Sequence, residues 1–567
     1  MKNKVIIKLL SSTVSFMELH NENDFKIKSY SNAIYNLERL PNKLANLNLN
    51  DLEELDGVGK SIATAINEIN TTGSLKKLKD LQQKTPAGIL RLIKLRGLGV
   101  KKIKTLWTEL GIDNGEDLTL SIQNGDVEKL KGFGAKTVAN ILDILAFAKE
   151  VNGFIHYATA ESLATKIKEK VAISLPKARI EFAGKLRRKW DVINALEFVI
   201  AAESPMLVDK ALMVLDALEK TASKSGLFTW RGLTKGDDPI EVIFHFSSFE
   251  KFYSTLLLKT GSQTHITHQF SNGSLKKMAE SATFDSEEAI YKALQIGYCE
   301  PEIREGNWEL EKTSNAELPT LVELSDITGA IHNHSTYSDG ENTLEEMATF
   351  CQQQGYQYLG ISDHSKATSF YANGMFEETV KKQHTEIDEL NKKMALFKIF
   401  KGIEADILAD GSLDYDAETL ATFDFVVASI HSGLSMDITK ATNRLLAAIA
   451  NPYTTMLGHM TGRLLLARRG YPIDHKIIII ACAKYGVIIE INAHPKRLDI
   501  DWRWVNYALA QGVLLSINPD AHATDGFKDM QYGVHIGRKG GLTKEQTFNT
   551  WSADKIETYF KERKLRN

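Results

Sequence analysis

The sequence predicts a protein of several domains that begins with a helical region and ends in an α/β barrel. At roughly 100 to 200 residues per domain, its 567 residues are too many for one domain. A glycine-containing pattern occurs three times near the N-terminus, between stretches with helical character. From residue 325 onward, short apolar runs alternate with helical stretches, the order of elements found in barrels of parallel strands.

The composition is that of a globular protein. Hydrophobic residues make up 43% and charged residues 25%, which argues against both a disordered chain and a membrane protein. The first stretch, MKNKVIIKLLSSTVSF, is interrupted by Lys8 and lacks a small-residue cleavage site, so it predicts an amphipathic helix and a cytoplasmic protein. Cys299, Cys351 and Cys482 show no C-x-x-C spacing, and we expect them to be reduced and buried.

The repeated pattern reads LDGVGKSIATAI from residue 55, LRGLGVKKIKTL from residue 95 and LKGFGAKTVANI from residue 130. Each copy predicts a helix end, a turn and the start of a second helix. Glycines at both turn positions leave the backbone N–H groups uncovered, and the N-terminus of the next helix attracts anions. The predicted phosphate-binding glycines are Gly57, Gly59, Gly97, Gly99, Gly132 and Gly134.

Lysines stand at the start of each second helix, where a cation opposes the helix dipole unless a phosphate lies nearby. They are Lys60, Lys101, Lys102 and Lys136. The pattern resembles the helix-hairpin-helix motif, which binds the DNA backbone without reading bases. The alternative is a tight turn in a helical bundle, and the threefold occurrence favours DNA binding. A slight excess of Lys and Arg over Asp and Glu in the first 150 residues permits this contact.

Further segments resemble the family X DNA polymerases: FKIKSYSNAIYNL, TPAGILRLIKLRGLG, IEFAGKLRRKWDVINALEFVIAA, TGSQTHI and ALQIGYCEPEIREG. The resemblance implies a helix-hairpin-helix domain over residues 1–84, fingers with two such motifs over 85–152, a degenerate palm over 153–260, and a thumb and linker over 261–322. The palm and thumb would have the α+β nucleotidyltransferase-like fold.

The polymerase site implied by this resemblance is degenerate. Polymerisation needs clustered carboxylates to hold two metal ions. The family's G-D-x-D motif falls on the four residues from Ile193 to Leu196, which places Asn194 and Leu196 where two aspartates belong. The strand of the third acid offers Glu241. A one-residue shift would bring in Asp191 or Glu197 but no Asp-x-Asp pair, so we expect polymerase activity to be lost.

Potential metal ligands follow seven apolar runs in residues 325–567. Barrel enzymes build their sites at the carboxyl ends of the strands, so these side chains are expected to converge. His332 and His334 are two residues apart on a strand and can chelate one ion. The other run-end groups are Asp363, His364, Glu404, His431, His459, His494, Asp520 and His522.

Imidazole combined with carboxylate suits manganese or zinc, with iron as a further option. The number of ligands predicts two or three divalent ions. Such ions lower the pKa of a bound water to about 7 and neutralise a phosphate, which is the chemistry of phosphoester hydrolysis.

The string HNHSTYSDG, with the later ligands, resembles the PHP (polymerase and histidinol phosphatase) domain, and implies a distorted (β/α)7 barrel over residues 323–567. Carried over by position, the metal ligands are His332, His334, Asp339, His364, Glu404, His431, His459, Asp520 and His522. In relatives the acid at Glu404 bridges ions, and His494 replaces a usual Asn, so we assign it to the pocket lining. Arg463, Arg468 and Arg497 are candidate catalytic groups that bind substrate phosphate, with surface salt bridges as the alternative.

The sequence therefore predicts a metal-dependent DNA nuclease or phosphatase of DNA repair. The resemblance implies 3′-to-5′ exonuclease, 3′-phosphatase and abasic-endonuclease activities, on gapped, nicked or 3′-blocked DNA, in a chain that is monomeric and does not bind membranes. The alternatives are an active DNA-directed DNA polymerase with proofreading, a small-molecule phosphatase resembling histidinol phosphatase, and a scaffold that only binds DNA.

Overall fold

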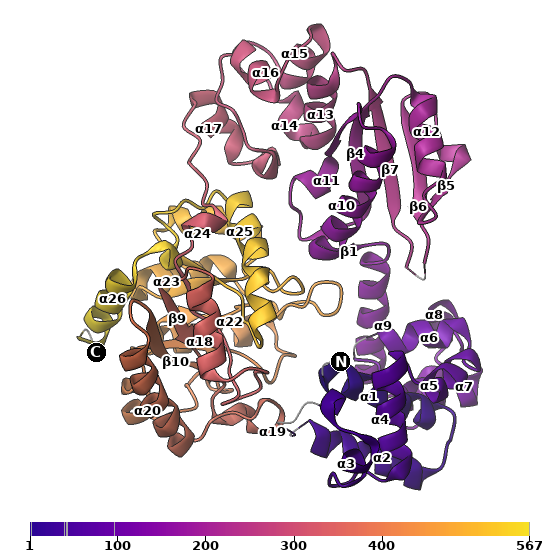
Figure 1. The fold of residues 1–567 in the computed structure, drawn as a ribbon, viewed down its shortest axis with the longest axis vertical. Helices are drawn as coiled ribbons and strands as arrows, with labels where there is room; N and C mark the ends of the chain where they lie inside the picture. The colour runs from indigo at the N-terminus through magenta and orange to yellow at the C-terminus, as the bar shows by residue number, and fades with distance from the viewer. Residues whose placement is uncertain (2, 39, 41–43, 96, 237, 566–567) are drawn as a thin grey trace. The chain divides into compact units, whose positions relative to one another are not determined.

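The computed structural model describes residues 1, 3–38, 40, 44–95, 97–236 and 238–565 (Figure 1). The chain divides into two compact units, residues 1–152 and 153–567. None of the described helices is both long and apolar enough to span a bilayer. The three cysteines are free and buried, as predicted.

The first unit is built from helices (Figure 1). The amphipathic helix expected at the start is present, and its apolar face, including Ile6, Leu10 and Met17, is buried. The helices are α1 (Asn3–Leu19), α2 (Asp24–Leu37), α3 (Leu49–Glu53), α4 (Lys60–Thr72), α5 (Lys76–Gln83), α6 (Ala87–Lys94), α7 (Val100–Leu110), α8 (Gly115–Gln123) and α9 (Ala135–Glu150).

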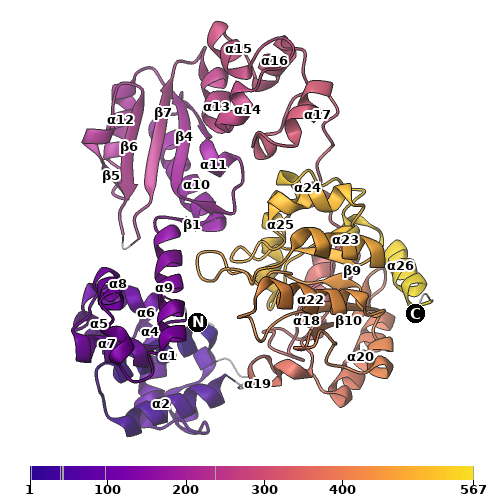
Figure 2. The same ribbon diagram turned by 180° about the vertical axis from the view of Figure 1, so that it is seen from behind.

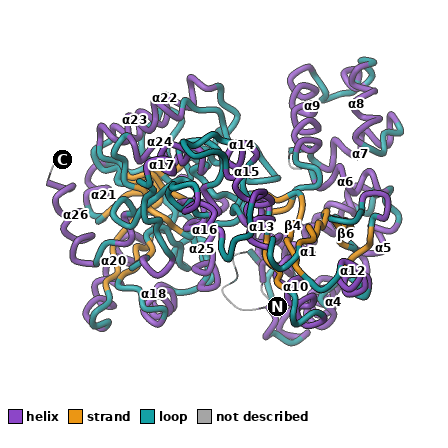
Figure 3. Tube along the Cα trace, turned by 90° about the horizontal axis from the view of Figure 1, so that it is seen from above, coloured by secondary structure: helices purple, strands orange, loops and turns teal. Residues whose placement is uncertain are grey.

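The second unit begins with a five-stranded sheet in the order β2-β4-β7-β6-β5. Strands β4 and β7 are parallel and the other pairs are antiparallel. Phe198 and Phe244 stack at 4.6 Å between ring centroids in its core. Helices α10 and α12 lie beside this sheet; Figure 3 draws the helices in purple and the strands in orange. The elements are β1 (Ile155–His156), α10 (Tyr157–Ser174), β2 (Arg179–Phe182), α11 (Gly184–Arg187), β3 (Val192–Ile193), β4 (Ala195–Ala201), α12 (Pro205–Met213), β5 (Leu218–Lys220), β6 (Thr229–Thr234) and β7 (Glu241–Ser247).

A helical segment follows the sheet. Its buried Arg304 lies 2.7 Å from Glu287, and Arg187 of α11 lies 2.6 Å from the same carboxylate. The two guanidinium groups hold the pKa of Glu287 at about 2, although burial alone would raise it. This buried pairing joins the segment to the sheet. Its helices are α13 (Phe252–Thr260), α14 (Gln263–Thr267), α15 (Leu275–Ser281), α16 (Glu287–Ala293) and α17 (Glu309–Asn315).

The last part of the chain is the predicted barrel of seven parallel strands, in the order β14-β13-β12-β11-β10-β9-β8. All strand residues are buried except Lys398 and Lys401 of β10, which are half-buried, as expected for a parallel sheet covered by helices. They are β8 (Gly329–Ala330), β9 (Tyr358–Ile361), β10 (Lys398–Asp406), β11 (Phe425–Ser429), β12 (Met456–Leu457), β13 (Ile488–Asn492) and β14 (Leu515–Asn518).

Helices surround this barrel, and Figure 2 shows α22 and α23 side by side on it. The helices are α18 (Leu344–Gln353), α19 (Ser369–Ala372), α20 (Glu377–Lys393), α21 (Ala417–Ala421), α22 (Ile438–Ala450), α23 (His475–Tyr485), α24 (Trp502–Ala510), α25 (Met530–Lys539) and α26 (Ala553–Leu565).

A buried asparagine closes the gap between the first and last strands. The side chain of Asn549 accepts a hydrogen bond from the Ile517 amide and donates to the carbonyls of Ile517 and Gly329. Beyond these strands, Asn333 forms a parallel bridge with Ala521. The segments that carry the first and last predicted ligands are thereby brought side by side.

Candidate functional site

The predicted ligands converge at the carboxyl ends of the barrel strands. His332 and His334 follow β8, and the amide of His334 donates to the carbonyl of Ala521 at 2.9 Å. Asn333 between them donates its side-chain amide to the carbonyl of Gly360. These bonds fix the backbone on which both imidazoles are mounted.

Glu404, on β10, lies at the centre of the cluster. It is 1% exposed, and the ring nitrogens of five histidines lie around its two carboxylate oxygens. The distances are 3.4 Å for His332, 3.6 Å for His334, 2.9 Å for His364, 3.1 Å for His431 and 3.0 Å for His459. A carboxylate in this position can bridge metal ions.

A second grouping surrounds Asp339. Its Oδ1 atom lies 3.3 Å from Nε2 of His522 and 3.6 Å from Nε2 of His364. With His334, these residues offer four ligand atoms within 4.8 Å of one another. Asp520 Oδ1 lies 3.1 Å from His334 Nε2, so all nine predicted ligands belong to one cluster.

The chemistry of these atoms fits divalent metal ions. Within the described residues, His332 Nε2, Asp339 Oδ1, His364 Nδ1 and both oxygens of Glu404 are buried without a hydrogen-bond partner. Buried polar atoms normally have partners, and such a concentration of unpaired donors and acceptors is a sign of an ion-binding site. The mixed imidazole and carboxylate set matches manganese, zinc or iron better than magnesium or calcium.

The charges of the cluster offset one another. Burial alone would raise the pKa of Glu404, but His431, His332 and His364 hold it well below its usual value. Burial, and then two neighbouring imidazoles, lowers the pKa of His334 to about 3. The cluster thus contains an ionised carboxylate beside a neutral imidazole, the forms in which both groups bind metal.

Two buried carboxylates that the sequence analysis did not select hold ligands in place. Glu490 of β13 lies 2.6 Å from Nδ1 of His332 and accepts from the amide of His459 at 2.7 Å. Asp406 Oδ1 lies 2.9 Å from Nδ1 of His431. Carboxylates in such positions orient ligating imidazoles and fix their tautomers. An acid within an apolar strand, as in YGVIIEIN, is the signal that could have revealed Glu490.

Asp363 also has a supporting position. It is fully buried and accepts hydrogen bonds from Ser335, Ser338 and Gln383. Burial raises its pKa to about 6. These contacts hold the loop that carries Asp339, and Asp363 stands outside the groups of potential ligands.

The three candidate arginines differ in their surroundings. The guanidinium of Arg463 donates to the carbonyls of Arg497 and Leu498 and lies 2.5 Å from Asp501. It also lies 3.7 Å from Asp191. These contacts with the backbone and with two acids match the salt-bridge alternative for Arg463.

Arg468 donates to the carbonyl of Gly462 at 2.6 Å. Arg497 reaches the metal cluster, because its Nε lies 3.7 Å from Asp520 Oδ2. Burial and then the charge of Arg497 lower the pKa of His459. Arg497 thus lies beside Asp520, one of the predicted metal ligands. Burial lowers the pKa of the half-buried His494 to about 4, which keeps its ring neutral.

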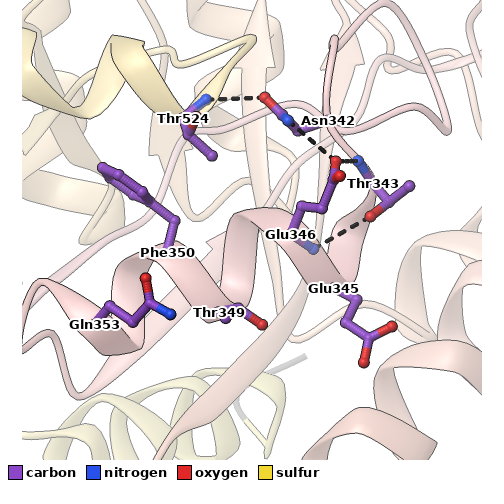
Figure 4. A pocket seen from close by; sticks show the side chains of 8 residues that line it. All are labelled: Asn342, Thr343, Glu345, Glu346, Thr349, Phe350, Gln353 and Thr524. Atoms are coloured by element: carbon purple, nitrogen blue, oxygen red, sulfur yellow. Dashed lines mark hydrogen bonds between the residues drawn. The ribbon is translucent and has the colours of Figure 1, made fainter.

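A cavity of about 460 Å³ lies on α18 and is lined also by Asn342 and Thr524 (Figure 4). Two carboxylates, Glu345 and Glu346, are among its lining residues. Glu346 takes part in a capping box with Thr343 at the start of α18. These two carboxylates make the lining of the cavity acidic.

The residues assigned to the degenerate polymerase site lie in or beside the five-stranded sheet. Leu196 is fully buried in the sheet core, and Asn194 accepts from Lys185 at 3.3 Å. Glu241 lies 2.8 Å from Arg231 and is thus already paired. Among the described residues, no group of three potential metal ligands occurs in this sheet.

The three glycine turns of the first unit have the predicted form. Gly57, Gly97 and Gly132 have φ angles of 74°, 98° and 89°, which only glycine adopts without strain. The second glycines, at residues 59, 99 and 134, are N-caps of α4, α7 and α9 and provide no side-chain cap. The first-turn amides of these helices are therefore left for an outside partner.

Each turn is anchored by its central apolar residue. Val58, Leu98 and Phe133 are buried, whereas the flanking glycines are exposed. The lysines lie in the first turn of the second helix of each hairpin, and three of the four are exposed: Lys60, Lys101, Lys136, with Lys102 half-buried. In the third copy the first helix is a short 3-10 turn, Val127–Lys129.

Comparisons with known proteins agree with both regions. Residues 1–75 match the helix-hairpin-helix domain family and residues 330–494 match the PHP domain family. Asp520 and His522 lie beyond the matched segment, and the fold brings them to it. A probable phosphatase of Thermoanaerobacter sp. (strain X514) is 28% identical over 41% of this chain and 94% of its own length. A probable phosphatase of Acetivibrio thermocellus is 24% identical over 41% of this chain and 95% of its own length.

A longer match covers both units. The DNA polymerase/3′-5′ exonuclease PolX of Bacillus subtilis (strain 168) is 35% identical over 99% of this chain and 100% of its own length. A hydrolase with DNA-binding hairpins and a metal-dependent barrel is consistent with both sets of relatives. The chain belongs to the bacterial family X DNA polymerases of the PolX type, which carry a C-terminal PHP domain.

Proposed function

We propose that this protein is a DNA-repair phosphoesterase that acts through its barrel and has lost polymerase activity. It would remove nucleotides or blocking phosphates from 3′ ends, or incise at abasic sites, on gapped or nicked DNA. The observation that carries the proposal is the arrangement of five imidazoles around the buried carboxylate of Glu404.

The residues of the cluster would hold two or three divalent ions, and manganese or zinc match the ligands best. Glu404 would bridge them, with His332, His334 and Asp520 at one position and Asp339, His364 and His522 at another. His431 and His459 would complete a third. Bound ions of this kind activate water and neutralise a phosphodiester.

The protein's own groups would bind and orient the substrate. Arg497 would pair with a phosphate oxygen, since a guanidinium recognises phosphate bidentately. The hairpins of the first unit would hold the DNA backbone through their free amides and lysines, without selecting sequence. We further propose that the active form is a monomer.

The loss of polymerase activity is supported by Asn194 and Leu196. The side-chain amide of Asn194 and the buried alkyl group of Leu196 carry no negative charge. Two metal ions held close together need such charge to offset their mutual repulsion. Glu241, paired with Arg231, cannot by itself replace the missing pair of acids.

One experiment tests these points together. The purified protein is analysed for metal and then incubated with a gapped duplex whose upstream strand carries a 5′ label and either a 3′ hydroxyl or a 3′ phosphate, with and without dNTPs. We expect shortening or dephosphorylation that depends on manganese or zinc, and no extension. Extension of the primer would refute the loss of polymerase activity, and absence of any cleavage would refute the phosphoesterase proposal.

A small-molecule phosphatase is the second candidate, because the probable phosphatases match the barrel alone. The first unit argues against it, since DNA-binding hairpins would serve no purpose on such a substrate. Comparing turnover of histidinol phosphate with turnover of a 3′-phosphorylated oligonucleotide separates the two functions.

A further inference from the structure

Two aromatic side chains stand exposed on the barrel close to the metal ligands. Phe370 and Tyr371, in the short helix α19, are 91% and 63% exposed. Exposed single apolar residues are common, but two adjacent rings this exposed beside a catalytic cluster are not explained by packing. The metal chemistry described above does not use them.

The segment that carries the rings is attached to the metal site at both ends. The amide of Met375 donates to the carbonyl of His364 at 2.8 Å, and Ser365 pairs with Met375 in a parallel bridge. Asn373 donates its side-chain amide to the carbonyl of Ser338, the neighbour of Asp339, at 3.4 Å. The segment that carries the rings is therefore hydrogen-bonded to His364, a predicted metal ligand, and to the residue before Asp339, another predicted ligand.

The attachment is also tight. A side chain at Gly374 would meet the carbonyl oxygen of Ser365 at 1.9 Å, so the two ends of the segment close against each other. The amide of Ala367 donates to Asp414 at 2.9 Å. These contacts make the segment a fixed support rather than a loose loop.

The pKa of Tyr371 responds to the charged groups of the cluster. Partial burial, together with the negative charges of Asp406, Glu404 and Asp339, raises the pKa of Tyr371 to about 12. The phenol thus lies within electrostatic range of three carboxylates of the metal site, although its ring remains largely open to solvent.

We propose that Phe370 and Tyr371 form a stacking platform for unpaired bases at the end of a nucleic-acid strand whose phosphoester lies at the metal cluster. The inference rests on the proposed function and names the substrate feature that the site recognises. Aromatic rings hold single-stranded nucleic acid by stacking on base faces, with little regard to sequence. Residues 365–375 contain one lysine and no acid, so the segment does not repel a polyanion.

The test compares two oligonucleotides that carry the same 3′ phosphoester. One has normal bases at its last two positions and the other has tetrahydrofuran analogues that lack bases there. In the double variant Phe370→Ala/Tyr371→Ala, kcat/KM on the normal end should fall by roughly tenfold or more, as expected for lost base stacking. Activity on the base-free end, already low in the wild type, should not fall further.

A matched control is Tyr485→Ala. Tyr485 is 43% exposed at the end of α23, immediately before β13, and therefore lies at the end of the barrel opposite to the metal cluster. Its loss should leave both activities unchanged. Metal content of all three proteins should be equal, because neither aromatic residue of α19 is a ligand.

A second readout does not depend on hydrolysis. An oligonucleotide with 2-aminopurine as its 3′ base and phosphorothioate linkages should change fluorescence on binding the wild type and Tyr485→Ala, but not the double variant. A fluorescence change in the double variant as large as that in the wild type would overturn the platform, and so would an equal loss of activity on both oligonucleotides. The two proposals can fail separately. If the wild type does not hydrolyse the oligonucleotide but shows a fluorescence change that is lost in the double variant, the proposed function is refuted and the platform is supported.

Discussion

The replacement Glu490→Gln tests whether a carboxylate that contacts no substrate controls the metal site. Oε1 of Glu490 faces Nδ1 of His332 at 2.6 Å and the side-chain amide of Asn518 at 3.0 Å. Oε2 accepts from the amide of His459 at 2.7 Å and from Asn492 at 3.4 Å. Both carboxylate oxygens are thus surrounded by donors, and the residue is fully buried.

Glutamine has the same size but cannot accept at both positions. With its NH2 group toward His332, the glutamine would face two donors, Nδ1–H of His332 and the side-chain amide of Asn518. The His332 ring could avoid this clash only by carrying its proton on Nε2, the atom that faces Glu404. With the NH2 group toward His459, it would face two other donors. A buried donor left without an acceptor costs about 1–3 kcal/mol. Such supporting carboxylates typically change metal affinity or activity by about 10- to 100-fold.

The assay is metal affinity, measured by titration in a metal-buffered solution and by elemental analysis after dialysis, together with hydrolysis of a 3′-phosphorylated oligonucleotide. Both should fall by about 10- to 100-fold. Glu309→Gln is the matched control, because Glu309 is also fully buried and lies 2.9 Å from Nδ1 of His265, far from any predicted ligand in sequence. It should lower the melting temperature without lowering metal affinity. If Glu490→Gln bound metal as tightly as the wild type, the assigned positioning role would be wrong.

Three further outcomes are expected. The double variant His332→Ala/His334→Ala should lose hydrolysis and metal while binding DNA normally, and retained cleavage would place the chemistry elsewhere. Lys101→Ala/Lys102→Ala should weaken DNA binding across sequences and reduce the slope of log affinity against log salt by about 0.9 for each lost phosphate contact, measured by fluorescence anisotropy. Arg497→Lys should raise KM for a 3′-phosphorylated oligonucleotide by about tenfold through the loss of bidentate pairing, with metal content unchanged; an unchanged KM would exclude Arg497 from the phosphate site.

Much of the barrel was predictable because local and global patterns coincide. Six of the seven strands contain a predicted ligand or are followed by one within three residues, so the parallel alignment of the strands gathers the ligands at one edge. The glycine turns were predictable for a similar reason: the apolar residue between two glycines, such as Val58, must be buried, and the glycines must supply the special backbone angle.

The surroundings of charged side chains were not predictable in the same way. Arg463 has the residue type of a phosphate ligand, yet its bonds go to Asp501 and to carbonyls after β13. Glu490 is one acid in an apolar strand, and only the distance to His332 shows what it supports. No periodic pattern in the sequence indicates that a ring such as that of Phe370 is exposed.

By itself, the sequence determined the order of elements, the ends of the barrel strands, the three glycine turns and the identities of the clustered histidines and carboxylates. These features depend on residue type and short-range spacing, which a linear chain displays. Only the tertiary structure decided how Asn549 closes the barrel and which buried carboxylates hold the imidazoles. Those contacts join residues far apart in the chain, and their geometry is set by packing of the whole barrel rather than by any local pattern.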